Sequence, residues 1–137
     1  MLSQEEIWWR PNAASNSVGN LVLHLEGNVR QWIISGRAAN RIGASGTKSS
    51  PSAGRFPVAI WCARLRATVT EACRVLQKLS PEALSRNYRI QGYKASGLDA
   101  VADVVEHFSY HTGQIVYVTK VKTREGSALH TAAQLQD

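Results

Sequence analysis

The sequence predicts an all-α protein that folds as one domain. Three long segments repeat apolar residues at intervals of three and four, which is the period of an amphipathic helix. A chain of 137 residues has the length of a single domain, and 44% of its residues are apolar, enough to form a core. Only residues 86–94 have a pattern compatible with extended backbone, and nothing in the chain supports a sheet. We therefore expect one helical domain over residues 1–137.

The first helical signals lie near the amino terminus. Residues 3–6, Ser-Gln-Glu-Glu, have the form of a capped helical turn. A long helix is predicted over about residues 15–36, because apolar residues gather on one face while Glu26 and Arg30 lie on the opposite side. The apolar face consists of Val18, Leu21, Val22, Leu25, Val29, Trp32 and Ile33. The candidate N-cap residues are Asn12, Ser15 and Asn16.

The second long helix is predicted over about residues 57–79. Pro57 suits its first turn, and an apolar stripe runs along it. The stripe consists of Trp61, Leu65, Val69, Ala72, Leu76 and Leu79. Residues 38–55, between the first two long helices, are rich in Gly, Ser and Ala and have no apolar period, which predicts a flexible loop.

The third long helix is predicted over about residues 98–123, directly after Gly97. Its apolar seam has the alternating spacing of a helix in a bundle. The seam consists of Val101, Val104, Phe108, His111, Ile115 and Val118. A shorter turn of helix is predicted at residues 80–84, capped by Ser80 with Pro81 in its first turn.

The two cysteines do not have the spacing of a disulfide. Cys62 and Cys73 fall on the same predicted helix, and the rise of a helix puts them roughly 16 Å apart. A disulfide requires Cα atoms within about 7 Å, and two such distant thiols make a poor metal site. We therefore interpret both as small buried apolar residues.

The composition also limits the possible partners and location. The net charge is +6, but the sixteen Lys and Arg residues are scattered and have no aromatic platform among them, so nucleic-acid binding is the weakest interpretation. No apolar run has the length of a membrane span, and no signal peptide is visible at the start. We expect a cytoplasmic protein without membrane contact.

His107 and His111 have the spacing of a metal-binding pair. Residues four apart on a helix point in directions about 40° apart, so both rings can reach one ion about 2.1 Å from each nitrogen. The pair is not the zinc-protease motif, because Phe108 stands where that motif has a catalytic Glu. The competing interpretation is that these histidines are hydrogen-bonded core residues, as single histidines on an apolar face usually are.

His24 is the candidate third ligand, at the edge of the apolar face of the first long helix. If the two helices pack face to face, three nitrogens converge and leave coordination positions open, as in catalytic metal sites. Asp103 and Gln114 lie near the direction of the histidine pair, and either can accept the remaining ring N–H. The fourth histidine, His130, falls in a polar tail, where we expect it to be exposed.

Parts of the chain resemble the DinB/YfiT-like superfamily. The segments that carry the resemblance are IWWRPNAASNSVGNLVLHLEGNVRQWI at residues 7–33, RIQGY at residues 89–93 and VVEHFSYHTGQIVYVTK at residues 104–120. The resemblance implies a DinB-like four-helix bundle with an up-down-down-up path, and a metal held by His24, His107 and His111. Known relatives include bacillithiol transferases and mycothiol-dependent maleylpyruvate isomerase, in which the metal activates a low-molecular-weight thiol.

The chain departs from the family at its start. The family usually has a long helix before the position of Leu2, whereas here only a short stub precedes Ile7. We therefore expect a truncated first helix: either the chain is truncated, or a partner supplies that helix, or the bundle is incomplete. The apolar groove that this would expose on the other helices favours a homodimer.

The leading functional hypothesis is a divalent-metal-binding protein, with Zn or Ni as the metal, that activates a low-molecular-weight thiol for attack on a small electrophilic substrate. No catalytic side chain is identified; Glu106 is the nearest candidate base, but an acidic residue on a bundle helix is more often a surface residue. Arg89 and Tyr93 are candidates for contact with an anionic cofactor. The alternative is a non-catalytic metal-binding or stress-response bundle protein.

Two tryptophans, Trp8 and Trp9, either line a pocket mouth or, as we favour, pack across the bundle end.

Overall fold

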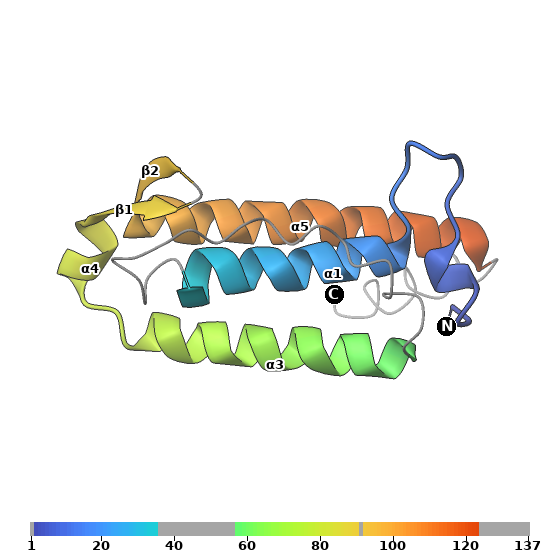
Figure 1. The fold of residues 1–137 in the computed structure, drawn as a ribbon, viewed down its shortest axis with the longest axis horizontal. Helices are drawn as coiled ribbons and strands as arrows, with labels where there is room; N and C mark the ends of the chain where they lie inside the picture. The colour runs from blue at the N-terminus through green and yellow to red at the C-terminus, as the bar shows by residue number, and fades with distance from the viewer. Residues whose placement is uncertain (1, 36–56, 91, 124–137) are drawn as a thin grey trace, which may run out of the picture.

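The computed structural model describes residues 2–35, 57–90 and 92–123. In these residues three long helices lie side by side (Figure 1): α1 is Val18–Val29, α3 is Val58–Gln77 and α5 is Gly97–Lys122. Helix α1 continues directly into η2, a π-helical segment over Arg30–Ser35. The shorter elements are η1 at Glu6–Trp8, α4 at Pro81–Ser85, β1 at Asn87–Ile90 and β2 at Tyr93–Ser96. The prediction of a mainly helical protein is confirmed.

Helix α1 begins at a cap that the sequence analysis did not choose. Ser17 is the N-cap, and its hydroxyl accepts a hydrogen bond from the backbone N–H of Asn20 at 3.1 Å. The prediction of Asn12, Ser15 or Asn16 as the cap was wrong. Asn12 and Ser15 instead bond to each other in the preceding loop, at 2.9 Å. Because several candidate cap residues precede this helix, propensity alone could not choose among them.

Helix α5 begins with a capping box. The Ser96 hydroxyl accepts from the backbone N–H of Asp99, and the Asp99 carboxylate accepts from the backbone N–H of Ser96, both at 3.0 Å. Gly97 is the first residue of the helix and is buried against the end of α4. A Cβ atom on Gly97 would lie 2.5 Å from the carbonyl oxygen of Ala83, so a glycine lets the two helices approach here.

A small β-hairpin corrects the expectation that the chain holds no sheet. Strands β1 and β2 pair antiparallel, with Asn87 opposite Ser96 and Ile90 opposite Tyr93. Gly92, in the turn between them, has a φ of 85°, a conformation that glycine adopts readily. Extended backbone was expected over residues 86–94, but each strand has only four residues, too few for a clear alternating pattern.

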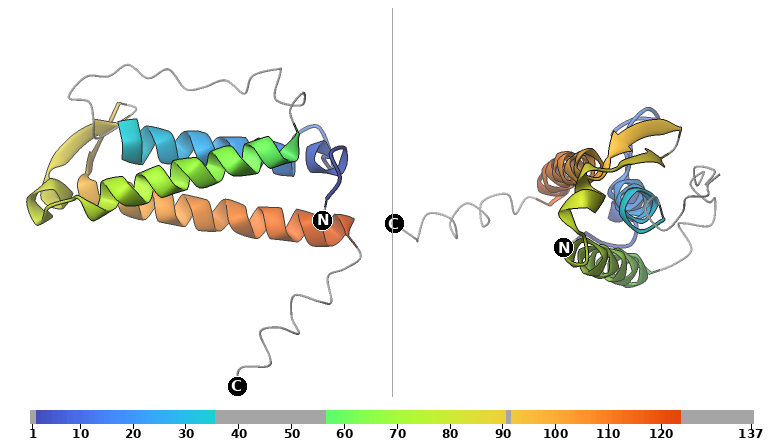
Figure 2. Two further views of the ribbon diagram at one scale, coloured as in Figure 1. Left: turned by 90° about the horizontal axis from the view of Figure 1, so that it is seen from below. Right: turned by 90° about the vertical axis from the view of Figure 1, so that its left-hand side faces the viewer.

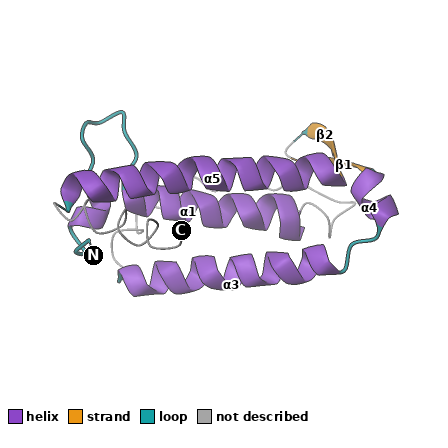
Figure 3. Cartoon of the chain, turned by 180° about the vertical axis from the view of Figure 1, so that it is seen from behind, coloured by secondary structure: helices purple, strands orange, loops and turns teal. Residues whose placement is uncertain are grey.

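Helix α1 is the centre of the helical arrangement. It packs against both α3 and α5, whereas α3 and α5 make little direct contact with each other. The views from below, from the end and from behind show α1, α3 and α5 side by side (Figures 2 and 3). The buried core cluster consists of Val29, Ile33, Ala72 and Val104. The predicted four-helix arrangement is not seen in the described residues, which hold three long helices.

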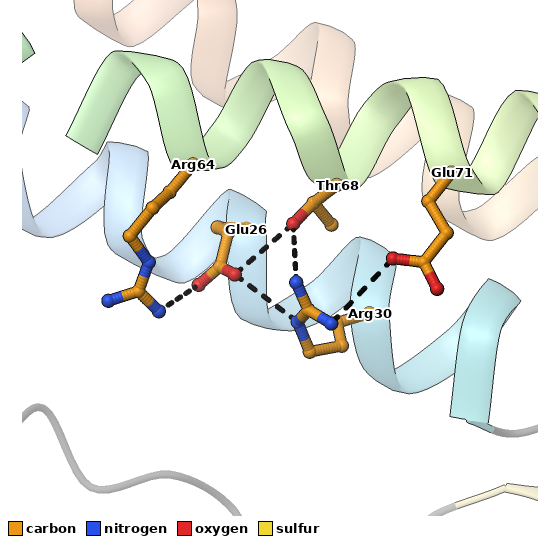
Figure 4. A network of polar contacts seen from close by, with 5 residues as sticks. All are labelled: Glu26, Arg30, Arg64, Thr68 and Glu71. Carbon is orange, nitrogen blue, oxygen red and sulfur yellow. Dashed lines mark hydrogen bonds and ion pairs between the residues drawn. The ribbon is translucent and has the colours of Figure 1, made fainter. Parts of the chain in front are cut away.

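A polar network joins α1 to α3 on the side of α1 away from α5 (Figure 4). Glu26 is only 8% exposed, and its carboxylate accepts from Arg30 at 3.2 Å, Thr68 at 3.2 Å and Arg64 at 3.3 Å. Arg30 also donates to the fully buried Thr68 hydroxyl at 2.8 Å. Glu26 was expected on the side of the helix opposite the apolar face, but it is buried against α3, about 80° around the helix from the centre of that face. Three donors satisfy the buried carboxylate, which would otherwise be costly.

Both cysteines lie on α3, as predicted, and neither forms a disulfide within the described residues. The expectation that they are buried was wrong, because Cys62 and Cys73 are exposed on a flank of α3 that no described helix covers. The predicted loop at 38–55 and His130 lie outside the described residues. No helix in the described ranges combines the length and the apolar character needed to cross a bilayer.

Candidate metal centre

Three histidine rings converge between α1 and α5. His24 comes from α1, and His107 and His111 come from successive turns of α5. Their ring centroids are separated by 4.5 Å, 4.8 Å and 5.0 Å. One nitrogen from each ring can be chosen so that all three lie within 4.8 Å of one another. The structure therefore brings together the three side chains that the sequence analysis selected.

Helix packing explains why the rings meet. Leu25, next to His24, and Val104, one turn before His107, are both buried where the two helices pack. His111 is 9% exposed, His107 is half-buried and His24 is exposed. The cluster is therefore closed on the His111 side and open to solvent at His24, so a small molecule can reach it from that side.

Gln114 fixes the tautomer of His111. The Nδ1 atom of His111 lies 2.7 Å from the side-chain oxygen Oε1 of Gln114. Because an amide oxygen can only accept, Nδ1 must carry the proton and donate it. The other ring nitrogen, Nε2, then has a free lone pair, which is the form of histidine that binds a metal. Of the two candidates for this supporting role, Gln114 occupies it and Asp103 is exposed.

His24 and His107 face each other through the same ring atom. Their Nε2 atoms are 2.6 Å apart, so one must donate a proton and the other must accept it. Two nitrogens bound to one ion at about 2.1 Å each are about 3.0–3.4 Å apart in octahedral or tetrahedral geometry. The two rings would therefore have to separate by less than about 1 Å to admit an ion in place of the shared proton. The three residues fit a divalent metal ion.

The surroundings of His24 and His107 favour the neutral form of these two rings. Burial lowers the pKa of His24, and the nearby His107 and His111 lower it further. Burial also lowers the pKa of His107, with His111 acting in the same direction and the charge of Asp103 opposing it. Because only neutral imidazole ligates a metal, these shifts keep the ligand form available below the usual histidine range.

Asn28 adds a polar atom on the same flank of α1 as His24. It lies one helical turn after His24, and its side-chain oxygen is buried without a hydrogen-bond partner among the described residues. An unpaired buried acceptor is costly, so a donor at this position would be bound favourably. The sequence does not indicate that this oxygen is buried, because the position of Asn28 along a helix does not show what packs over it.

The other candidate residues do not join the ring cluster. Glu106 is exposed and points about 100° around the helix from His107. Arg89 and Tyr93 are exposed on the hairpin before the start of α5 (Figure 1), whereas His107 and His111 lie in the middle of that helix. An open pocket of about 290 Å³ at the hairpin is lined by Asn87, Tyr88, Arg89 and Lys94, and contains none of the three histidines.

Trp8 and Trp9 pack at one end of the bundle. A Cβ atom added to Gly19 would lie 2.6 Å from the Trp8 ring, so the absence of a side chain at Gly19 lets that ring lie on α1. The ammonium group of Lys122 lies 4.6 Å from the centre of the Trp9 ring, a cation–π contact with the end of α5. The packing interpretation of these two residues is confirmed.

The fold and the ring cluster define the molecule as a helical protein with a candidate three-histidine metal centre between two of its helices. The model of a family described as protein of unknown function (DUF1572) matches residues 67–132, just under half of the chain. A search of curated proteins found no match.

Two solved structures share the fold. One is a DinB-like protein, YjoA, from Bacillus subtilis, with a TM-score of 0.63 and 19% identity. The other is a DinB-like protein from Bacillus cereus, with a TM-score of 0.67 and 16% identity. Each match covers 88% of this chain and 78% of the other. The chain therefore has the DinB-like fold.

Proposed function

We propose that this protein binds one divalent metal ion through His24, His107 and His111, and acts as a transferase that activates a low-molecular-weight thiol for attack on a small electrophile. The observation that carries the proposal is the convergence of three imidazole nitrogens, from two helices distant in the sequence, within 4.8 Å. The donor set suits Zn²⁺ or Ni²⁺, because borderline metals of this kind prefer imidazole nitrogen.

The arrangement of the rings supports a reactive site in preference to a purely structural one. Structural zinc sites use four protein ligands, whereas three histidines leave at least one position for a water molecule or a thiol. The open side of the cluster is at His24, which is exposed. A divalent ion in such a site lowers the pKa of a coordinated thiol and supplies thiolate at neutral pH.

The residues of the chain orient the site. Gln114 holds His111 in the tautomer whose Nε2 faces the other rings. In the proposed reaction the thiol S–H loses its proton to solvent. The sulfur lone pair then forms a bond to an electrophilic carbon, whose leaving group departs with its bonding electrons.

Metal binding is tested by titrating metal-free protein with Zn²⁺ and Ni²⁺ against a chromogenic chelator. We expect one ion per chain in the wild type. Loss of a residue that only supports a metal ligand lowers metal affinity by ~10–100-fold. His111→Ala removes a ligand itself, so its affinity should fall by at least that factor. His130→Ala is the matched control, because it removes the fourth histidine of the chain, which is not among the proposed ligands, and should bind normally. Equal binding by the His111 and His130 variants would overturn the proposed site.

Catalysis is tested separately from metal binding. The metal-loaded wild type and the His111→Ala variant are compared in a thiol-conjugation assay with a fluorogenic bimane electrophile and a panel of small thiols. The proposal predicts a metal-dependent rate that is lost in the variant. Equal rates, in a protein that nevertheless binds metal at the histidines, would remove the transferase and leave a non-catalytic metal-binding protein.

A further inference from the structure

The exposed apolar residues of this protein are concentrated on α5. Eight large hydrophobic side chains are exposed in the described residues, and six of them belong to this one helix. Those six are Leu98, Val105, Tyr110, Val116, Tyr117 and Val121. Three of them, Leu98, Val105 and Val116, share one face of the helix, whereas the other three point about 100–140° around the helix from that face.

Part of this surface forms a continuous uncharged stripe. Exposed residues follow one another at alternating intervals of four and three, which is the seam spacing of paired helices. We define the α5 stripe as Leu98, Ala102, Val105, Ser109, Thr112 and Val116. At 1.5 Å per residue it is about 27 Å long. No charged residue occurs among its six members.

The stripe faces away from the histidines and lies beside the core. The neighbouring flank of α5 carries Val101 and Phe108, which are partly buried against the core cluster. Because α3 and α5 make little direct contact, no described helix covers the stripe. His107 and His111 point about half a turn around α5 from the centre of the stripe. A partner bound on the stripe would therefore leave the metal centre accessible.

The stripe is complementary to itself when two copies of α5 run antiparallel. A two-fold axis level with residue 107 places Leu98 and Val105 opposite smaller side chains of the second copy. The facing pairs are Leu98 with Val116, Ala102 with Thr112, and Val105 with Ser109. Such a contact is isologous, since each pair occurs twice, which is the usual symmetry of a homodimer.

Charge favours the antiparallel arrangement over a parallel one. The first half of α5 carries acidic residues, Asp99, Asp103 and Glu106, while its last turns carry Lys120 and Lys122. Antiparallel pairing moves Asp99 and Asp103 of one copy away from the same residues of the other and towards its basic end, whereas parallel pairing places every charged residue level with its own copy. The helix dipoles also attract when two helices run antiparallel.

We propose that the α5 stripe is the interface of a homodimer in which two copies of α5 pack antiparallel about a two-fold axis level with residue 107. A helix 10–12 Å wide that pairs over about 27 Å gives a projected contact of roughly 300 Å². That contact is smaller than the ~800 Å² per partner of a standard stable interface. The dimer should therefore be weak and should form only at high protein concentration.

Sedimentation equilibrium of the full chain tests the interface. From about 1 to about 100 µM, a range suited to a small interface, the wild-type mass should rise from 15.0 kDa towards twice that value. Val105→Glu, at the centre of the stripe, should stay at the monomer mass. Val121→Glu is the matched control, because Val121 has the same side chain on the same helix, is 57% exposed against 62% for Val105, and lies off the stripe. Circular dichroism checks that all three chains keep their helix content.

Two results would overturn the interface: a wild type that stays monomeric over the whole range, or a Val105→Glu variant that still dimerises. Dimerisation should also survive removal of metal by a chelator and the His111→Ala substitution, because the stripe and the rings lie on different sides of α5. The outcome is therefore independent of the proposed metal chemistry.

Disulfide crosslinking tests the direction of the two helices. The background is a chain with Cys62→Ser and Cys73→Ser, both at exposed positions. Mixing Val105→Cys chains with Ser109→Cys chains should give a mixed disulfide on mild oxidation, since these positions face each other in the antiparallel pair. The antiparallel arrangement would be contradicted if Val105→Cys chains alone formed disulfide-linked dimers rapidly while the mixture gave no disulfide between Val105→Cys and Ser109→Cys chains.

Discussion

The hydrogen bond between Gln114 and His111 gives the most informative perturbation of the candidate metal centre. In Gln114→Leu the Nδ1–H of His111 loses its acceptor, although the side chain keeps a similar volume. The ring, which is only 9% exposed, can then move its proton to Nε2, which would occupy the lone pair needed for the metal. Loss of a supporting partner of this kind lowers metal affinity by about 10–100-fold, or about 1.4–2.7 kcal/mol.

A competition titration with a chromogenic chelator measures this change. The histidines themselves are all retained in Gln114→Leu, so the reduction can be assigned to orientation and tautomer. Gln114→Glu is the control, since a carboxylate keeps the acceptor and should preserve or increase affinity. If Gln114→Leu binds zinc as tightly as the wild type, the tautomer argument is wrong.

Three further predictions concern stability. Thr68→Val removes the buried hydroxyl that bridges the two sides of the polar network, and should lower the free energy of unfolding in urea by about 1–2 kcal/mol; no change would show that the network is not stabilising. Gly19→Ala places a methyl group against the Trp8 ring and should cost about 1–3 kcal/mol, whereas Gly113→Ala, with open space around it, should stabilise by up to about 1 kcal/mol. The opposite order of melting temperatures would contradict this packing. The hydrogen bonds from the Ser96 hydroxyl and the Ser96 backbone N–H hold the pKa of the Asp99 carboxyl below its ordinary value of about 3.9. Its contribution is therefore complete above that pH and is lost as the pH falls through the folded pKa, and the Asp99→Asn variant should show a shallower acid-induced loss of stability than the wild type.

Much of the helical architecture could be predicted, because amphipathic period is a strong local signal. The predicted helices at 57–79 and 98–123 differ from α3 and α5 by one or two residues at each end. The hairpin was missed because its strands are short and its pairing depends on the turn at Gly92. The burial of Glu26 could not be predicted either, since it depends on α3 packing over the polar side of α1.

The histidines of the site could be selected from the sequence for two reasons. His107 and His111 have the spacing that places two rings on one side of a helix. His24 lies at the edge of an apolar helical face, and the family resemblance also implies it as a ligand. What the sequence lacked was the geometry between helices: the close approach of His24 to His107 and the direction of the Gln114 side chain. These features depend on how α1 packs against α5, a contact between segments more than 80 residues apart.

X-ray absorption spectroscopy of the zinc-loaded protein tests the central claim most directly. The three-histidine centre predicts an edge and fine structure with three imidazole nitrogens at about 2.0–2.1 Å and no sulfur. A Zn–S distance of about 2.3 Å would instead show that the exposed cysteines on α3 hold the ion, and the account of the site would be wrong.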